Sequence, residues 1–221
     1  MRRIKAAIFD MDGTLLDSMP IYSTVEADYL KSVGITPRSD LNNVLRPFTD
    51  QETAMYFQTE YGVRKSLAEI EAGRSRLLED FYFNKAPLKS GVLEVLENLS
   101  GRGVRMCVVT ATDRRLVEPA LRRCGILDYF ERIFTCGEEA TTKRVPDIYI
   151  RAAAFLGADI EDTLVVEDAS YAVRTAKKAG FPVIAVYDLS SENYREEIIR
   201  FSDHYLEDMD GALEIFETVF S

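Results

Sequence analysis

Short runs of consecutive apolar residues place the strongest constraint on the fold of this chain. The segments AAIF, CVVT and LVVE do not alternate with polar residues, which is typical of strands covered on both faces by helices. Six such strands are expected, at Lys5–Asp10, Val104–Thr110, Arg132–Cys136, Thr163–Asp168, Pro182–Tyr187 and His204–Glu207. Segments with helical periodicity lie between strands, at Gly91–Leu99, Arg115–Cys124, Asp147–Leu156 and Tyr171–Ala179. The alternation predicts an α/β fold with a doubly wound parallel sheet.

The alternation is interrupted between Asp17 and Lys85, where no strand-like run occurs. Three amphipathic segments follow one another there, and two of them begin with a capping box, Thr49-Asp50-Gln51-Glu52 and Ser66-Leu67-Ala68-Glu69. A helical insertion of about 65 residues is far longer than an ordinary connection between elements. We therefore expect a Rossmann-like α/β core formed by residues 1–16 and 86–221, with a small helical cap domain, residues 17–85, inserted after the first strand.

Charge and composition limit the partners of the chain. Its 221 residues include 27 Lys+Arg and 37 Asp+Glu, a formal net charge of -10, which disfavours non-specific binding to nucleic acid or an anionic membrane. No stretch approaches the ~18 apolar residues of a membrane span, and the apolar run before Asp10 is too short for a signal peptide. The spacing of the three cysteines fits neither a disulfide framework nor a zinc half-site, which favours core thiols. We expect a cytoplasmic protein, monomeric or weakly dimeric.

Polar residues follow several of the expected strands. The carboxyl ends of parallel strands meet at one edge of the sheet, and ligands bind there, at the point where the strand order reverses. Lys143, in the loop before the helix that starts near Asp147, is expected at the same edge. The candidate site therefore consists of Asp10, Asp12, Gly13, Thr110, Ala111, Lys143, Glu167 and Asp168.

The acidic residues of this set suggest a metal and a reaction. Four carboxylates at close range would repel one another, and a bound cation removes that repulsion. A ligand set of oxygens alone suits Mg²⁺. Asp10 and Asp12 are separated by one residue, so one can attack as a nucleophile while the other exchanges a proton, and a carboxylate is a known nucleophile in phosphoryl transfer. Gly13 permits a tight turn that brings backbone amides onto a phosphate.

Four segments resemble, in order, the four motifs of the haloacid dehalogenase-like (HAD) superfamily: Phe9–Ser18, Val108–Thr110, Lys143–Asp147 and Val165–Ser170. The helical insertion resembles the C1 cap of that superfamily. The chain is most similar to the branch that includes β-phosphoglucomutase, phosphoglycolate phosphatase and sugar-phosphate phosphatases. This resemblance implies a phosphatase that acts on a small phosphorylated metabolite through an aspartyl-phosphate intermediate.

The resemblance also implies the roles of the residues that carry the chemistry. Asp10 would be the nucleophile and a Mg²⁺ ligand. Asp12 would be the general acid/base and would bind the metal through its backbone carbonyl. Lys143 would neutralise Asp10 and the transferring phosphate, since positioned cations supply much of the catalysis in phosphoryl transfer.

The remaining positions are implied to bind phosphate and metal. Thr110 and the amide of Ala111 would hold the transferring phosphoryl group. Asp168 would complete the metal site, with Glu167 beside it as a ligand, either directly or through water.

Some positions depart from the family pattern. Arg144 stands where the third motif usually has a proline. In the cap, Asp50 occupies the place of the arginine with which the mutase holds a second phosphate, and Tyr22 occupies the place of a mutase histidine. Both differences favour hydrolysis over mutase chemistry, although Arg46, Arg74 or Arg76 could supply another cation.

Other function classes fit the sequence less well. A catalytically silent phosphate-binding or regulatory module predicts damage to the motif set, and none is visible. A phospho-receiver domain gathers similar residues but lacks the cap and the second acid at Asp12. The dehalogenase branch lacks the second aspartate, while phosphonatases replace it and use a cap lysine.

Overall fold

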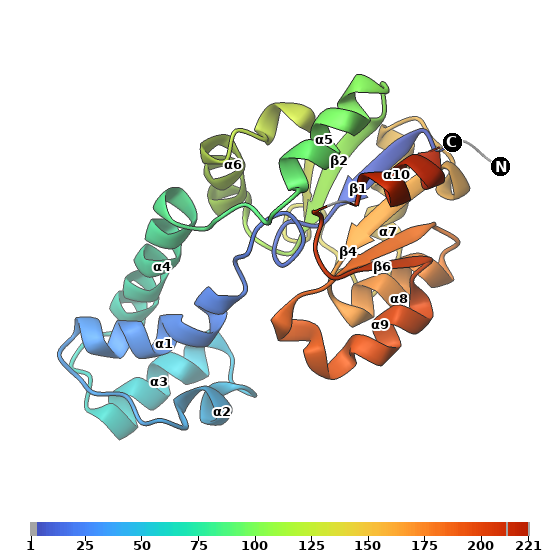
Figure 1. Cartoon of the computed structure of the whole chain (residues 1–221). Coiled ribbons are helices and arrows are strands. Elements are labelled where there is room, and N and C mark those ends of the chain that lie inside the picture. The colour runs from blue at the N-terminus through green and yellow to red at the C-terminus, as the bar shows by residue number, and fades with distance from the viewer. Residues whose placement is uncertain (1–3, 211, 221) are drawn as a thin grey trace. The chain divides into compact units, whose positions relative to one another are not determined.

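The computed structural model describes residues 4–210 and 212–220 and contains a six-stranded parallel sheet (Figure 1). The strand order is β3-β2-β1-β4-β5-β6, so the order reverses at β1. All six predicted strands are confirmed, to within one residue at each end. Their bounds are Ala6–Phe9 for β1, Arg105–Thr110 for β2, Ile133–Thr135 for β3, Thr163–Glu167 for β4, Val183–Val186 for β5 and His204–Leu206 for β6.

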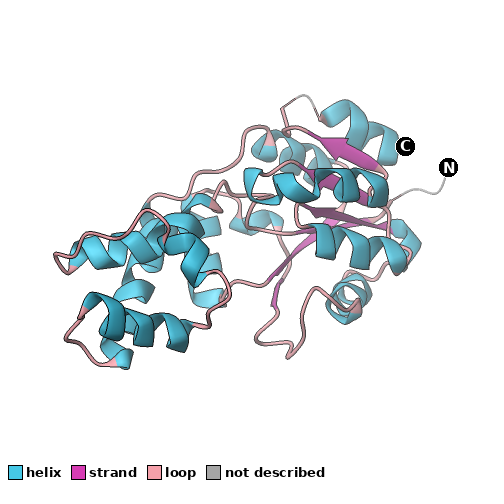
Figure 2. Ribbon diagram, turned by 90° about the horizontal axis from the view of Figure 1, so that it is seen from below, coloured by secondary structure: helices cyan, strands magenta, loops and turns pink. Residues whose placement is uncertain are grey.

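Helices cover both faces of the sheet (Figure 2). Their bounds are Val92–Gly101 for α5, Arg114–Arg123 for α6, Asp147–Phe155 for α7, Ser170–Lys178 for α8, Arg195–Phe201 for α9 and Leu213–Phe220 for α10. Short 3-10 turns lie at Leu127–Tyr129, Ile160–Asp162 and Leu189–Tyr194. Because α7 packs on β1 and β2 and α8 packs on β4 and β5, these strands are buried, as their continuous apolar sequence predicts.

The strand register places three chain segments at one edge of the sheet. Phe9 at the end of β1 pairs with Val108 of β2 and with Val166 of β4. The backbone amide of Asp10 then donates a hydrogen bond of 3.0 Å to the carbonyl of Val166. From the level of Phe9, β4 continues for one more residue and β2 for two, so all three strands end close together at the edge where the sequence predicts a site.

A second compact unit comprises Met19–Lys85 and is entirely helical. Its helices are Pro20–Ser32 for α1, Leu41–Leu45 for α2, Asp50–Tyr61 for α3 and Leu67–Asn84 for α4. The sequence predicts three helical segments here, and the fourth helix, α2, has only five residues, too few to show a helical period. Both predicted capping boxes are present, at Thr49 with Glu52 and at Ser66 with Glu69. Stacked Tyr29 and Phe57 rings, 5.7 Å apart, lie in the core of this unit.

The first boundary of the helical unit lies two residues later than expected, because Asp17 and Ser18 belong to the sheet unit. The amide of Asp17 donates to the carbonyl of Pro87, and the hydroxyl of Ser18 donates to the Asp12 carboxylate.

Two further properties concern the described residues as a whole. None of their helices has the length and apolar character needed to cross a membrane, and Cys107, Cys124 and Cys136 are free thiols.

The capping box of α3 yields a stability prediction. Thr49 Oγ1 accepts a hydrogen bond from the amide of Glu52 (3.3 Å), so Thr49→Ala leaves that amide without its cap and should lower the free energy of unfolding by about 1 kcal/mol. Thr59→Ala, at another exposed threonine of the same helix, is the matched control and should change it by less than ~0.5 kcal/mol. Urea denaturation followed by circular dichroism measures both. Equal losses would show that the capping box does not stabilise α3.

Candidate functional site

The centre of the predicted site is a buried ammonium group between two carboxylates. Lys143 Nζ donates a short hydrogen bond to Asp10 Oδ1 and a second one, of 2.7 Å, to Glu167 Oε1. All three side chains are at most 6% exposed. Asp10 follows β1, Glu167 ends β4, and Lys143 comes from the loop between β3 and α7. Three segments that are distant in sequence thus meet at the edge of the sheet where β1 and β4 end.

Asp168 adds a third carboxylate to this acid–lysine cluster of Asp10, Lys143, Glu167 and Asp168. Asp168 is 3% exposed and accepts a hydrogen bond of 3.4 Å from Thr14 Oγ1. One carboxylate oxygen from each of the three acids lies within 4.8 Å of the others. Three carboxylates and one ammonium leave an excess of two negative charges in a buried space, and the donors are all oxygens. This donor set fits a hard divalent cation such as Mg²⁺.

Burial and mutual repulsion disturb the pKa values of the cluster. Burial raises the pKa of Asp10 from 3.8 to about 7, because the opposing attraction of Lys143 is weaker and the charges of Glu167 and Asp12 add to the rise. Burial, followed by repulsion from Asp10 and Glu167, raises the pKa of Asp168 well above its ordinary value. Burial alone would lower the pKa of Lys143, but the two carboxylates raise it above its usual range. The cluster therefore retains protons near neutral pH when no cation balances it.

Asp12 lies outside the group of three acids and has its own hydrogen-bond donors. Ser18 Oγ donates to Asp12 Oδ1 (2.6 Å) and Thr112 Oγ1 donates to Asp12 Oδ2 (2.7 Å). Each carboxylate oxygen is thereby held by one hydroxyl, which fixes the orientation of the side chain. The residue as a whole is half-buried rather than enclosed.

Gly13 is required by both its backbone conformation and its surroundings. Its φ is +83°, a left-handed value that L side chains rarely adopt. A Cβ at this position would lie 2.7 Å from Cγ of Asp168, which is closer than a van der Waals contact. The glycine thus allows the loop after β1 to pass directly against a carboxylate of the cluster.

Thr110 and Ala111 lie where β2 reaches the same edge. Thr110 is the last residue of β2, is 1% exposed, and its Oγ1 accepts a hydrogen bond of 3.1 Å from the amide of Thr112. Ala111 follows it and is exposed. The role of these two residues in phosphate binding remains a prediction.

Some of the residues that hold the site are not marked by any pattern in the sequence. Tyr149 of α7 is buried and donates from its hydroxyl to Glu167 Oε1 (2.8 Å). Nothing in the sequence around Tyr149 marks it, because an inward-facing tyrosine of an amphipathic helix is normally a packing residue. The hydroxyl of Ser18 was also missed as a partner of Asp12, although it ends the first motif.

Comparisons with known proteins identify the family to which the chain is similar. A family model described as haloacid dehalogenase-like hydrolase matches residues 7–186. Hexitol phosphatase B of Escherichia coli K12 is 26% identical over 194 residues, which cover 87% of each chain. The chloroplastic protein SUPPRESSOR OF QUENCHING 1 of Arabidopsis thaliana is 27% identical over 197 residues, which cover 86% of this chain but only 18% of that protein.

A solved structure shares the whole fold. The candidate β-phosphoglucomutase of Thermotoga maritima superposes with a TM-score of 0.85 at 24% identity, covering 97% of this chain and 99% of that one. At this level of identity the likeness concerns the fold alone. It confirms the predicted α/β architecture across nearly the full length of the chain.

The raised pKa of Asp10 makes the stability of the metal-free protein depend on pH. An acid whose pKa is higher in the folded state than in the unfolded state costs stability as the pH rises, here from about 4 to about 7. A divalent cation binds the ionised carboxylates and offsets this cost. We expect Mg²⁺ to raise the melting temperature more at about pH 8 than at about pH 5.5. Differential scanning fluorimetry in a metal-free buffer, with and without Mg²⁺, measures the two shifts.

Two variants sharpen this test. Asp10→Asn removes the ionisation and should make the Mg²⁺ effect both smaller and less dependent on pH. Asp17→Asn, at an exposed aspartate of the same segment, should retain the wild-type difference. A shift of equal size at both pH values in the wild-type protein would contradict a cation site built from these carboxylates.

Proposed function

Because the chain belongs to the haloacid dehalogenase-like hydrolases, we propose that it is a Mg²⁺-dependent phosphatase that hydrolyses the phosphomonoester of a small metabolite. The observation that carries this proposal is the buried acid–lysine cluster, with a second aspartate held beside it by two hydroxyls. The name of hexitol phosphatase B, which is similar over most of both chains, supports a phosphorylated carbohydrate as the substrate.

Asp10 is the proposed nucleophile. Lys143 binds its Oδ1, and no donor among the described residues hydrogen-bonds its Oδ2. Oδ2 attacks the phosphorus atom, the bond from phosphorus to the ester oxygen breaks, and the phosphoryl group is left on Asp10 as an acyl phosphate. The ammonium of Lys143 favours the ionised form of Asp10, a bound cation would add to this effect, and Lys143 balances charge on the transferring group.

Asp12 is the proposed general acid and base. In the first half-reaction its proton goes to the leaving alkoxide, which departs as the alcohol. In the second, its carboxylate removes a proton from water, the water oxygen attacks phosphorus, and the bond from phosphorus to Asp10 breaks, which releases phosphate. The hydroxyls of Ser18 and Thr112 hold the carboxylate in one orientation for both proton transfers.

The metal and the phosphate-binding groups complete the proposal. The side chains of Asp10 and Asp168 and the backbone carbonyl of Asp12 would hold Mg²⁺, with Glu167 as a ligand directly or through water. When bound, Mg²⁺ neutralises negative charge on the phosphate and the carboxylates. Gly13, the hydroxyl of Thr110 and the amide of Ala111 would hold the oxygens of the phosphoryl group.

Substitution of the two aspartates separates their roles. Asp10→Asn should abolish both turnover and formation of the phosphorylated protein, since an amide oxygen is a poor nucleophile. Asp12→Asn should lower kcat by about 100-fold or more, because the leaving group is no longer protonated. Hydrolysis of p-nitrophenyl phosphate and of a panel of sugar and polyol phosphates, with and without EDTA, measures turnover. Intact-protein mass spectrometry after rapid acid quench measures the phosphorylated form.

Asp17→Asn serves as the control and should keep kcat within about twofold of wild type, since surface substitutions have small effects. Turnover that survives in Asp10→Asn would contradict the nucleophile. Full activity in EDTA would contradict the metal requirement.

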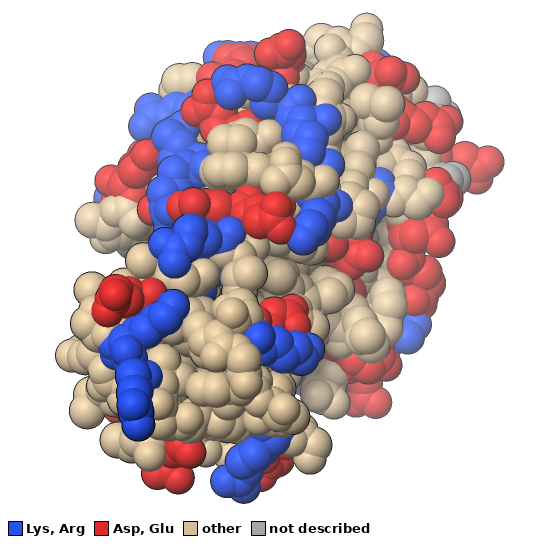
Figure 3. All heavy atoms as spheres, turned by 90° about the vertical axis from the view of Figure 1, so that its left-hand side faces the viewer, with Lys and Arg blue, Asp and Glu red and all other residues tan. Residues whose placement is uncertain are grey.

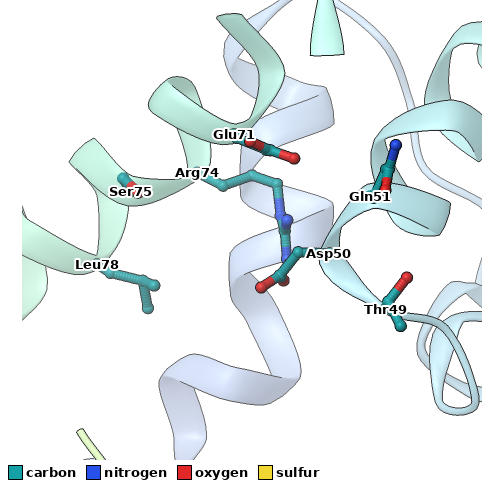
Figure 4. Close-up of a pocket in the computed structure, with 7 residues that line it drawn as sticks. All are labelled: Thr49, Asp50, Gln51, Glu71, Arg74, Ser75 and Leu78. Carbon is teal, nitrogen blue, oxygen red and sulfur yellow. The ribbon is translucent and has the colours of Figure 1, made fainter. Parts of the chain in front are cut away.

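A phosphosugar mutase is the second candidate, and the helical unit bears on it. A mutase must hold a second phosphate with cationic groups. A pocket of about 590 Å³ within this unit is lined by Thr49, Asp50, Gln51, Glu71, Arg74, Ser75 and Leu78 (Figure 4). Arg74 is its single cation, and Figure 4 shows it extending from α4 towards Asp50 at the start of α3.

The charge of Arg74 is already balanced by carboxylates. Its Nε donates to Glu26 Oε2 (2.8 Å), and its Nη2 donates to Glu26 Oε1 and to Asp50 Oδ1 (2.9 Å). The Asp50 side chain is 82% exposed. It therefore presents a negative charge to solvent, where a mutase would need a positive charge to bind the second phosphate. A charged hydrogen bond from Arg74 to a second phosphate would contribute roughly 1.5–3 kcal/mol to its binding. The carboxylates of Glu26 and Asp50 already occupy the guanidinium and oppose such a bond. The pairing therefore favours hydrolysis over mutase chemistry.

The two candidates give different products from one substrate. We expect incubation with β-glucose 1-phosphate and a trace of the 1,6-bisphosphate to yield inorganic phosphate, because the charge of Arg74 is already balanced by Glu26 and Asp50 and is not available to retain a phosphorylated intermediate. ³¹P NMR follows the products. Accumulation of glucose 6-phosphate would show that the chain is a mutase, while the same reaction with Asp10→Asn is the blank.

A further inference from the structure

A small cavity lined by cations lies in the sheet unit. Its volume is about 280 Å³, and its lining residues are Arg144, Tyr171, Arg174, Thr175 and Lys178. Three of these five side chains are positively charged and none is acidic. The acid–lysine cluster contributes none of them. In a chain with a net charge of -10, such a concentration of positive charge in one cavity needs an explanation.

The cavity is built by one face of α8 and by the loop that follows Lys143. Tyr171, Arg174 and Lys178 are spaced by three and four residues, so they lie on one side of the helix together with Thr175. Arg144 comes from the loop before α7, and its guanidinium carbon lies 4.6 Å from the centre of the Tyr171 ring. This cation–π contact brings a second segment of the chain to the face of α8.

Two of the three cations are not balanced by acids. Arg174 Nη1 binds Glu197 Oε1 at 2.6 Å, so its charge is compensated. Neither Arg144 nor Lys178 forms an ion pair with any carboxylate that the structure describes. Lys178 Nζ instead lies over the Phe201 ring, 6.0 Å from the ring centre. The adjacent Lys177, by contrast, binds Asp203 at 2.5 Å. On the face shown in Figure 3, Lys and Arg side chains likewise lie among Asp and Glu side chains.

We propose that this cavity is a binding site for a small phosphate-bearing anion, separate from the acid–lysine cluster. The guanidinium of Arg144 offers a planar pair of donors suited to two phosphate oxygens, and the Lys178 ammonium offers a further charge. The cavity volume of about 280 Å³ can accommodate one or two phosphate groups. The acidic surface charge of the chain also opposes a nucleic acid as the ligand. The proposal does not depend on the proposed phosphatase activity.

Binding of inorganic pyrophosphate to the full-length protein tests this site. The titration is carried out in EDTA, at constant ionic strength, so that the acid–lysine cluster has no metal and repels the anion. Isothermal titration calorimetry measures the affinity, and ¹H–¹⁵N NMR locates the binding. We expect the largest amide shifts on α8, at Thr175 and Lys178, rather than at Asp10 and Asp12.

Matched variants identify the groups responsible. Lys178→Gln and Arg144→Gln should each weaken pyrophosphate binding by about fivefold or more, since each removes one uncompensated charge from the anion. Lys177→Gln removes the same charge from the adjacent residue, outside the cavity lining, and should change the affinity by less than about twofold. Thermal melts confirm that all three variants fold. Lys178 is the more decisive of the two positions. Arg144 directly follows Lys143, so a substitution there could also disturb the acid–lysine cluster.

Three results would overturn the proposal. The wild-type protein could show no binding at a pyrophosphate concentration of about 10 mM, which would mean a dissociation constant too high for a specific site. The two cavity variants could bind as well as wild type. Lys177→Gln could weaken binding as much as Lys178→Gln, which would show a response to net charge rather than to a site.

Discussion

The structure of the candidate site depends on one buried interaction, the contact of the Lys143 ammonium with the carboxylates of Asp10 and Glu167. Charges are costly to bury, and acids this close together would otherwise take up protons. Lys143 balances part of that charge and leaves a remainder of two negative charges once Asp168 is included. That remainder is the physical reason to expect a divalent cation, because Lys143 alone does not offset the rise that burial causes in the pKa of Asp10.

The fold explains how these groups come together. In a parallel sheet whose strand order reverses at β1, the segments that follow β1 and β4 begin side by side at one edge. The apolar strands are fixed by burial on both faces, so the polar residues beyond them are held on a rigid support. Gly13 lets the loop after β1 pass against Asp168, where any side chain would clash. Hydroxyls from Ser18 and Thr112 then hold Asp12 beside the cluster, which would separate the proposed proton-transfer group from the proposed nucleophile.

Much of the fold could be predicted because its signals are local. Continuous apolar runs mark strands such as β4, and the sequence Thr49 to Glu52 marks the start of α3, since both depend on neighbouring residues alone. The five-residue α2 gave no period to detect. The boundary at Ser18 also escaped prediction, because it is set by a hydrogen bond to Asp12 within the folded loop.

In the candidate site, too, the residues themselves could be predicted from the sequence, whereas some of their contacts depend on the tertiary fold. Asp10, Lys143, Glu167 and Asp168 could be proposed from their positions after strands and from the motif resemblance, and the structure brings these four together. The contact of Lys143 with Asp10 is implied by the motif resemblance, but the partners of Glu167 could not be predicted. Glu167 accepts hydrogen bonds from both Lys143 and Tyr149, and the second of these depends on the packing of α7 against the sheet. The cation-lined cavity was equally hidden, because Arg144 and Lys178 are brought together only by the tertiary fold.

The central claim is that Asp10 takes up the phosphoryl group while a cation balances the surrounding carboxylates. A crystal structure of the protein with Mg²⁺ and beryllium fluoride, which mimics an acyl phosphate, tests both parts at once. The account predicts a beryllium atom bonded to a carboxylate oxygen of Asp10, a Mg²⁺ ion that contacts Asp10 and Asp168, and Lys143 within hydrogen-bond distance of the fluoride. Beryllium fluoride bound elsewhere, or a cluster that excludes Mg²⁺ at saturating concentration, would contradict it.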